Sequence, residues 1–271
     1  MKNINSNSNK PLSTCEESIK KELGDFYAKA DVHWESYSQI SLAWVHLKRA
    51  VRLYLADKPH VFSLLYGLVP KYRGIVVSKK TEVVIEGYPR SGNTYAVAAF
   101  HYAQQRDVII ARHQHSVAQV LFAVRYGLPC IVMIRKPKDA ILSYLIREPS
   151  ITLYEAIGLY TDYYNALSSH KHSFVIAKFE DVIIDFNAII RQVNAKYDCQ
   201  FRHYSPNKQS EMEIVSRIAY MEKIESGSSD IRCTHVAMPD NARSELKQWI
   251  DLMTTEYSFE EAEKAYNRFI G

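Results

Sequence analysis

The sequence predicts an α/β protein: a P-loop-type parallel sheet of about four to five strands flanked by helices, with a helical N-terminal extension. Two observations support this fold class. From residue 82 to residue 197, short apolar runs alternate with longer segments of helical composition, as in sheets whose two faces are both buried. The first run also leads through a glycine-bounded loop into an Ala-rich helix, which directs backbone N–H groups at one spot.

The order of the elements follows from these runs and from the Gly and Pro residues between them. The first strand is the run Val83 to Ile85, and the helix after the loop covers 93–105. Ser116 is a suitable N-cap for the next helix, because its hydroxyl can accept from a backbone N–H of the first turn. Later strands are expected at 107–111, 130–134 and 173–177, and later helices at 116–126, 137–147, from 152, at 185–197, at 211–224 and from 238.

The N-terminal part is expected to differ from the rest. Residues 1–13 are rich in Asn and Ser and are expected to form a disordered tail. Residues 14–80 are expected to be a helical segment packed on the core, and residues 81–271 the α/β domain. The segment mixes apolar residues with Lys and Arg, so a helix lying on a membrane surface is a second interpretation. Packing on the core with a solvated basic face is favoured, because such helices are the usual case.

Composition restricts the class of protein. The net charge is only +4, from 34 basic and 30 acidic residues, so no nucleic-acid partner is indicated. The four cysteines form no C-x-x-C pair, which argues against a disulfide scaffold or zinc site and fits a reducing compartment. The first residues are polar, without the apolar core of a signal peptide, and no stretch approaches the ~18 apolar residues of a membrane span. A cytoplasmic protein is expected.

The loop after the first strand predicts an anion site. Gly87, Gly92 and Thr94 fall in the register of the phosphate loop G-x-x-x-x-G-K-[ST], but Asn93 stands at the Lys position and Arg90 lies inside the loop. The loop therefore keeps the glycines and the hydroxyl of an anion-binding loop, but it lacks the Lys that contacts a triphosphate. The alternative is a glycine turn that merely connects a strand to a helix.

A second basic group follows the strand at 130–134. Arg135 ends that strand, and Ser143 lies about two turns into the next helix, so both can face the same edge of the sheet. A guanidinium with a hydroxyl is a good phosphate clamp. In the alternative interpretation, Arg135 pairs with Asp139 and Ser143 only packs.

Two histidines follow the strand at 107–111. His113 and His115 lie two apart, so in an extended segment they point the same way. No third ligand with suitable spacing stands nearby, so no metal is expected. A histidine at a strand end facing an anion loop is a candidate general base, and His113, nearer the strand, is preferred over His115.

Together these places resemble the sulfotransferases that use 3′-phosphoadenosine-5′-phosphosulfate (PAPS). Their Tyr-Pro-Lys-Ser-Gly-Thr-Thr-Trp loop is similar to residues 88–95, and their Arg-x-x-x-Asp-x-x-x-Ser-Tyr block to residues 135–144, over a match of roughly 81–197. The resemblance implies sulfuryl transfer to a hydroxyl or amine, with 3′,5′-ADP as product and His113 as base. The cofactor-binding residues it implies are Arg90, Ser91, Gly92, Asn93, Thr94, Tyr95, Arg135 and Ser143, with Arg90 and His115 also in the catalytic set.

The sequence departs from that family at several positions. Arg90 replaces the loop Lys, Tyr95 replaces a Trp that stacks on adenine, and Phe179 replaces the Tyr of a Tyr-Glu-Asp sequence. The late Arg-Lys-Gly block is missing, with Arg232 a weak substitute. Two other functions remain open: a P-loop small-molecule kinase using ATP, and a nucleotide-binding protein without catalysis. The acceptor (small molecule, sugar or lipid), peripheral membrane contact and oligomeric state are not determined by the sequence.

Overall fold

The computed structural model describes residues 47, 49–148, 151–226, 247–248, 251 and 258–271. The predicted tail at 1–13, the first part of the N-terminal extension, Arg232 and the start of the last predicted helix at 238 lie outside the described residues. No helix of the described part is long and apolar enough to cross a bilayer.

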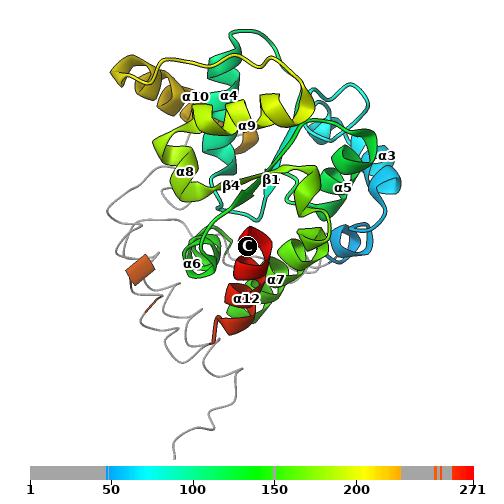
Figure 1. The fold of residues 1–271 in the computed structure, drawn as a ribbon. Coiled ribbons are helices and arrows are strands. Elements are labelled where there is room, and N and C mark those ends of the chain that lie inside the picture. Colours follow the sequence, from blue (N-terminus) through cyan, green and yellow to red (C-terminus); the bar gives the residue numbers. More distant parts are fainter. Residues whose placement is uncertain (1–46, 48, 149–150, 227–246, 249–250, 252–257) are drawn as a thin grey trace, which may run out of the picture.

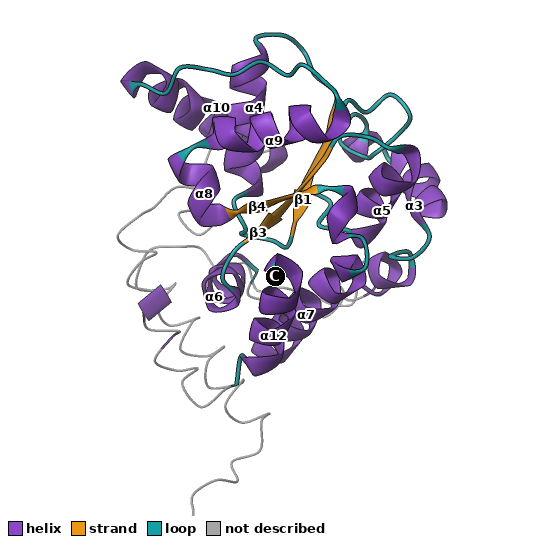
Figure 2. Cartoon of the chain, viewed as in Figure 1, coloured by secondary structure: helices purple, strands orange, loops and turns teal. Residues whose placement is uncertain are grey.

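The described chain is built on one parallel sheet, which confirms the α/β fold class (Figures 1 and 2). The second strand begins later than predicted, because the Ile109 N–H donates to the Glu82 carboxylate at 3.1 Å. The strand order is β2-β1-β3-β4, and the strands are β1 (Val83–Gly87), β2 (Ile110–Arg112), β3 (Cys130–Ile134) and β4 (Val175–Lys178).

Helices cover both faces of this sheet (Figure 1). Successive residues of one strand enter different cores, as the alternation of side chains in a strand requires: Val84 belongs to one core and Val83 to the other. One face is covered by α4 (Asn93–Gln104), α9 (Phe186–Tyr197) and α10 (Lys208–Ser226), and the other by α5 (Val117–Tyr126), α7 (Leu153–Ser168) and α12 (Glu260–Ile270).

The residues that precede α7 and α5 differ in whether their side chains form an N-cap hydrogen bond. Thr152 begins α7 as predicted, with a capping box to Glu155. Ser116 does stand at the N-cap of α5, but the expected side-chain bond is absent: its hydroxyl has no partner among the described residues. The remaining elements are α3 (Pro59–Gly67), η1 (Pro70–Tyr72), α6 (Pro137–Arg147), η2 (Lys171–Ser173) and α8 (Phe179–Ile184); of these, η1, η2 and α8 were not predicted.

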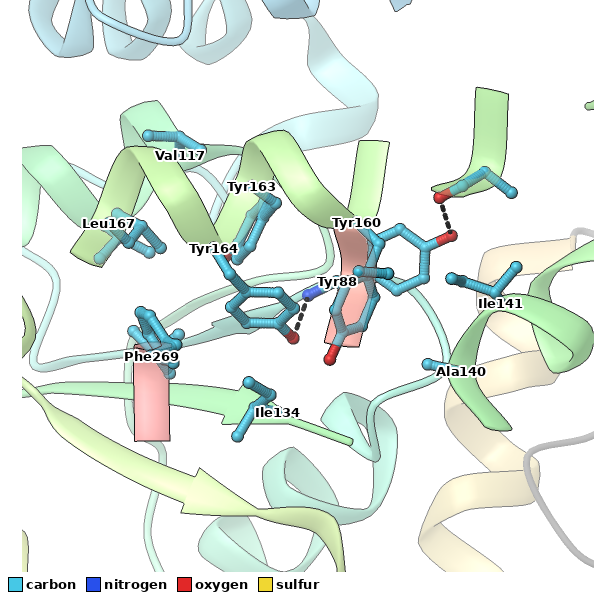
Figure 3. Packing of buried hydrophobic residues seen from close by; sticks show 14 of the residues in the cluster. Tyr88, Val117, Ile134, Ala140, Ile141, Tyr160, Tyr163, Tyr164, Leu167 and Phe269 are labelled. Atoms are coloured by element: carbon cyan, nitrogen blue, oxygen red, sulfur yellow. Dashed lines mark hydrogen bonds between the residues drawn. The ribbon is translucent and has the colours of Figure 1, made fainter. Parts of the chain in front are cut away.

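Three tyrosines of the core, which are labelled in Figure 3, donate hydrogen bonds to backbone carbonyls. The Tyr164 hydroxyl donates to the Met133 carbonyl at 2.8 Å, and the Tyr160 hydroxyl donates to the Arg135 carbonyl at 2.7 Å. Tyr88, fully buried, donates from its hydroxyl to the Ala156 carbonyl at 3.0 Å. The bonds of these three hydroxyls fix the backbone on which the candidate site is built.

Candidate active site

The candidate site lies at the carboxyl ends of β1, β2 and β3. The chain passes from β1 to β2 on one side and later places β3 on the other side, so the strand order reverses at β1. Ligands of open α/β sheets bind beyond the strand ends at such a point. The loop after β1, the segment 113–115 after β2, and Arg135 after β3 all leave the sheet at this edge.

The loop after β1 has a shape that depends on two glycines. A Cβ on Gly87 would lie 2.4 Å from the Met133 carbonyl oxygen, so β1 and β3 approach here too closely for any side chain. Gly92 has a φ of 93°, in the left-handed region, and a Cβ there would lie 2.8 Å from the Phe179 ring. Arg90 is also left-handed, with a φ of 67°. The loop therefore turns sharply between strand and helix, as a loop that presents its backbone to a ligand must.

Two of the predicted cofactor residues have side chains that maintain this loop. Asn93, at the position of the P-loop Lys, donates from Nδ2 to the Tyr88 carbonyl at 3.0 Å. Ser91 is fully buried, and its hydroxyl lies 3.4 Å from that of Tyr164. Asn93 can therefore offer its backbone N–H to an anion while its side chain holds the turn closed. The Ser91 N–H already donates to the Tyr88 carbonyl at 3.3 Å, so this residue closes the turn with its backbone as well.

The remaining two residues of the predicted loop lie in the first turn of α4. Thr94 is half-buried there. Tyr95 and Tyr204 are both half-buried and pack against the same core. Burial raises the pKa of the Tyr95 hydroxyl, so this residue presents a neutral aromatic group.

The structure brings the two predicted anion groups into direct contact. Arg90 donates from Nε to the Ser143 hydroxyl at 3.2 Å, and Arg135 donates from Nη1 to the Arg90 carbonyl at 3.3 Å. Ser143, on α6, is almost fully buried, so its contact with Arg90 lies below the surface of the protein. A loop after β1 and a helix after β3 thus contribute to one basic site.

Arg135 is not neutralised by the carboxylate that the alternative interpretation assigned to it. Asp139 pairs with Lys247, and no ion pair joins Arg135 to a carboxylate of the described residues. Its guanidinium lies 4.1 Å above the Phe179 ring instead, a favourable cation–π geometry. Burial lowers the pKa of Arg135, opposed by the charges of Asp139 and Glu180. A half-buried guanidinium that forms no ion pair within the described residues suits an anionic ligand.

Sequence reasoning missed Glu86, which holds the histidine segment. This residue is fully buried on β1, and its carboxylate accepts from the N–H groups of Gln114 at 2.8 Å and His115 at 2.9 Å. Gln119 donates to it from Nε2 at 2.7 Å. Burial raises the pKa of Glu86 to about 7 despite these bonds. In the sequence, this role of Glu86 is marked by a single carboxylate in the otherwise apolar run that forms β1.

The two histidines differ in chemistry. His115 Nδ1 lies 2.8 Å from the Gly87 carbonyl, which can only accept, so Nδ1 carries the proton; burial lowers its pKa to about 3. His113 Nδ1 lies 3.3 Å from Arg112 Nη1, which can only donate, so this nitrogen accepts. The rings lie 6.3 Å apart and nearly parallel. Both residues have left-handed backbones, with φ values of 57° and 47°.

The histidines do not form part of a metal cluster among the residues that the structure describes. Within that part of the chain, no group of three or more His, Cys, Asp or Glu side chains is arranged to hold a metal ion.

The comparisons with known proteins identify no family. No family model matches the sequence, and no curated protein matches it. Among solved structures, mouse sulfotransferase SULT7A1 complexed with PAP is similar with a TM-score of 0.39 and 12% identity, covering 75% of this chain and 95% of that chain. The similarity is weak in both superposition and sequence, so it carries no argument about function.

Proposed function

We propose that this protein is a sulfotransferase that moves a sulfuryl group from PAPS to a hydroxyl or amine acceptor. The observation that supports this most strongly is the convergence of Arg90, Arg135 and Ser143 at the edge where the strand order reverses. PAPS carries a phosphosulfate on one ribose carbon and a separate phosphate on another. Such a molecule needs one binding site for the phosphosulfate and a second for the separate phosphate. It does not need the Lys and Mg²⁺ that a triphosphate requires.

The residues of the site fit the two anionic groups of PAPS. The backbone N–H groups of residues 92–95, at the N-cap and first turn of α4, would hold the phosphosulfate, because N–H groups and the helix dipole favour negative charge there. Arg135 and Ser143 would hold the 3′-phosphate by charge-assisted hydrogen bonds. The half-buried ring of Tyr95 would pack on the adenine.

PAPS would supply the activated sulfuryl group, and the residues of the chain would position the acceptor and stabilise charge. His113 would take the proton of the acceptor hydroxyl as that oxygen attacks. Arg90 and the loop N–H groups would stabilise the negative charge that develops on the departing phosphate. Arg112 now donates to His113 Nδ1, so this contact must open before His113 acts as a base. Nδ1 can then take the proton of the acceptor, or, in the other tautomer, Nε2 can take it.

His115 has a different role in this proposal. A general base works best with a pKa near the working pH, and burial lowers the pKa of His115 to about 3. Its proton on Nδ1 is bonded to the Gly87 carbonyl. We therefore assign His115 to positioning the loop beside His113.

A thermal-shift comparison tests the class of cofactor. The expected result is stabilisation by 3′,5′-ADP but not by ADP or by ATP with Mg²⁺, because only 3′,5′-ADP carries a 3′-phosphate. Stabilisation by ATP with Mg²⁺ alone would indicate a kinase instead. Binding of 3′,5′-ADP without transfer from PAPS across phenols, alcohols, amines, sugars and lipids would indicate a nucleotide-binding protein without catalysis.

A further inference from the structure

Helix α3 and the turn after it expose a continuous row of aliphatic side chains. Leu64 and Leu68 are each 67% exposed. Val61, Leu64 and Leu65 have the spacing i, i+3 and i+4 and share one side of α3, and Leu68 and Val69 follow in the turn after the helix. We call this row the apolar stripe; it consists of Val61, Leu64, Leu65, Leu68 and Val69.

The opposite side of α3 already packs on the core. Phe62 and Pro59 are buried, and Phe62 packs with Leu55, Val76 and Ala118. Ser63 donates from its hydroxyl to the Val77 carbonyl at 2.6 Å. The helix is therefore apolar on two sides, one packed against α5 and the other exposed. An exposed apolar surface of this kind marks a binding site for a protein or a membrane.

The charge around the stripe distinguishes these partners. Residues 58–81 contain five Lys or Arg residues and no Asp or Glu, and residues 108–138, which include α5, also contain no Asp or Glu. Lys58 pairs with Asp57, but no ion pair joins the other four basic residues to a carboxylate of the described residues. These four, all exposed, are Lys71, Arg73, Lys79 and Lys80.

We propose that the apolar stripe and these four basic residues dock the protein on an anionic membrane surface. The aliphatic side chains would enter the boundary between headgroups and acyl chains, and the basic side chains would contact lipid phosphates. Nine residues of helix are about 13 Å long, which suits a helix lying in the plane of the surface. A symmetric contact between two copies is less suitable, because it would bring the same basic residues together. This inference does not depend on the proposed enzymatic activity.

Co-sedimentation of the full chain with vesicles tests the proposal. The protein is expected to bind vesicles of phosphatidylcholine mixed with phosphatidylglycerol, and to bind pure phosphatidylcholine much more weakly. Added salt should weaken the binding, since it screens the attraction of the basic residues to the lipid. A protein that stays in the supernatant with anionic vesicles, whether because another part of the chain covers the stripe or for any other reason, would overturn the proposal.

Two double variants test separately how the apolar stripe and the basic residues contribute to vesicle binding. L64S/L68S should lower the apparent partition coefficient by at least about tenfold, because it removes two exposed leucines from the buried area. K71Q/R73Q should lower binding to anionic vesicles and reduce its salt dependence. The matched control is Met212→Ser on α10, which is 71% exposed on a distant element and should bind like the wild type. Equal binding by L64S/L68S and the wild type would contradict a role for the stripe.

A positive signal and a measurement of mass complete the test. In Leu68→Trp, the fluorescence of the added indole should shift to the blue when anionic vesicles are added, relative to the same titration of the wild type. Light scattering separates a membrane site from a protein interface. A stable dimer that L64S/L68S converts to a monomer would show that the stripe contacts a second copy, and would overturn the proposal.

Discussion

The Nε atom of Arg90 donates to the Ser143 hydroxyl across 3.2 Å, although the two residues are 53 positions apart in the chain. One leaves β1 and the other lies on α6, so the contact joins the turn after one strand to the helix after another. Arg135 completes the group through the Arg90 carbonyl. A ligand that binds at this edge therefore meets three groups that are already organised around one another.

Arg135→Ala should weaken the binding of 3′,5′-ADP by roughly tenfold to a hundredfold, the usual range for a lost charge-assisted contact. Isothermal titration calorimetry measures this directly. Arg191→Ala is the control, because Arg191 forms only an exposed ion pair with Asp185 on α9 and should leave the affinity unchanged. Equal affinities of the wild type and Arg135→Ala would exclude the clamp.

His113→Asn should reduce the rate of sulfuryl transfer by at least about a hundredfold, the usual contribution of a general base, while 3′,5′-ADP still binds. Asn is used because it tolerates the left-handed backbone at this position better than Ala. His115→Asn should retain more activity, since the Asn amide can still donate to the Gly87 carbonyl. If His115→Asn were the more damaging change in turnover at normal cofactor affinity, the two roles would have to be exchanged.

Gly87→Ala should lower the free energy of unfolding by about 3 kcal/mol or more, because its Cβ would collide with a backbone carbonyl that cannot move aside. Gly92→Ala should also destabilise, through its left-handed φ and the nearby Phe179 ring. Gly158→Ala on α7 is the matched control: nothing lies within 4 Å of its Cβ, and alanine favours the helix by about 0.5–1 kcal/mol. Urea denaturation measures all three; a Gly87→Ala protein as stable as Gly158→Ala would contradict the close approach of β1 and β3.

Glu86 and His115 should have opposite effects on stability as the pH changes. Folding raises the pKa of Glu86 from 4.5 to about 7, so its contribution is full below 4.5 and decreases as the pH rises to about 7. Folding lowers the pKa of His115 from 6.5 to about 3, so its contribution is full above 6.5 and decreases as the pH falls to about 3. Between pH 4.5 and 6.5 the two largely cancel.

Glu86→Gln removes the titrating carboxylate and leaves the pH-dependent contribution of His115. The stability of the variant relative to the wild type should increase as the pH rises from 4.5 to 7, by up to about 1.4 kcal/mol per pH unit. Urea denaturation across this range measures the difference, in which the other titrating groups cancel. A difference that stays constant with pH would show that Glu86 does not change its proton affinity on folding.

Much of the fold could be predicted from the sequence because strands buried on both faces form short apolar runs. The run at 130–134 matches β3 residue for residue, since nothing polar interrupts it. Helix α8 was missed because its six residues are too few to show a helical period. The start of β2 was misplaced because a side chain, Glu82, occupies the N–H of Ile109, and the residue letters do not reveal such a bond.

The candidate site was predictable as a set of strand ends but not as a set of contacts. The rule that ligands bind at carboxyl ends places Arg90, Arg135 and His113 at one edge. It does not predict that Arg90 bonds to Ser143, nor that Asp139 pairs with Lys247, more than 100 residues away. Glu86 was missed for a similar reason: its three donors lie on the segment after β2 and on α5, which only the tertiary structure brings to β1.

The left-handed backbone at Arg90, Gly92, His113 and His115 restricts how this sequence can diverge. Val, Ile and Thr are strongly disfavoured in that conformation, because their branched Cβ collides with the neighbouring carbonyl. Descendants that keep the same turns should therefore exchange these four residues mainly for glycine, asparagine or aspartate. A related protein with β-branched residues at these positions must have a different backbone in both turns, and therefore a different shape at the carboxyl edge of the sheet.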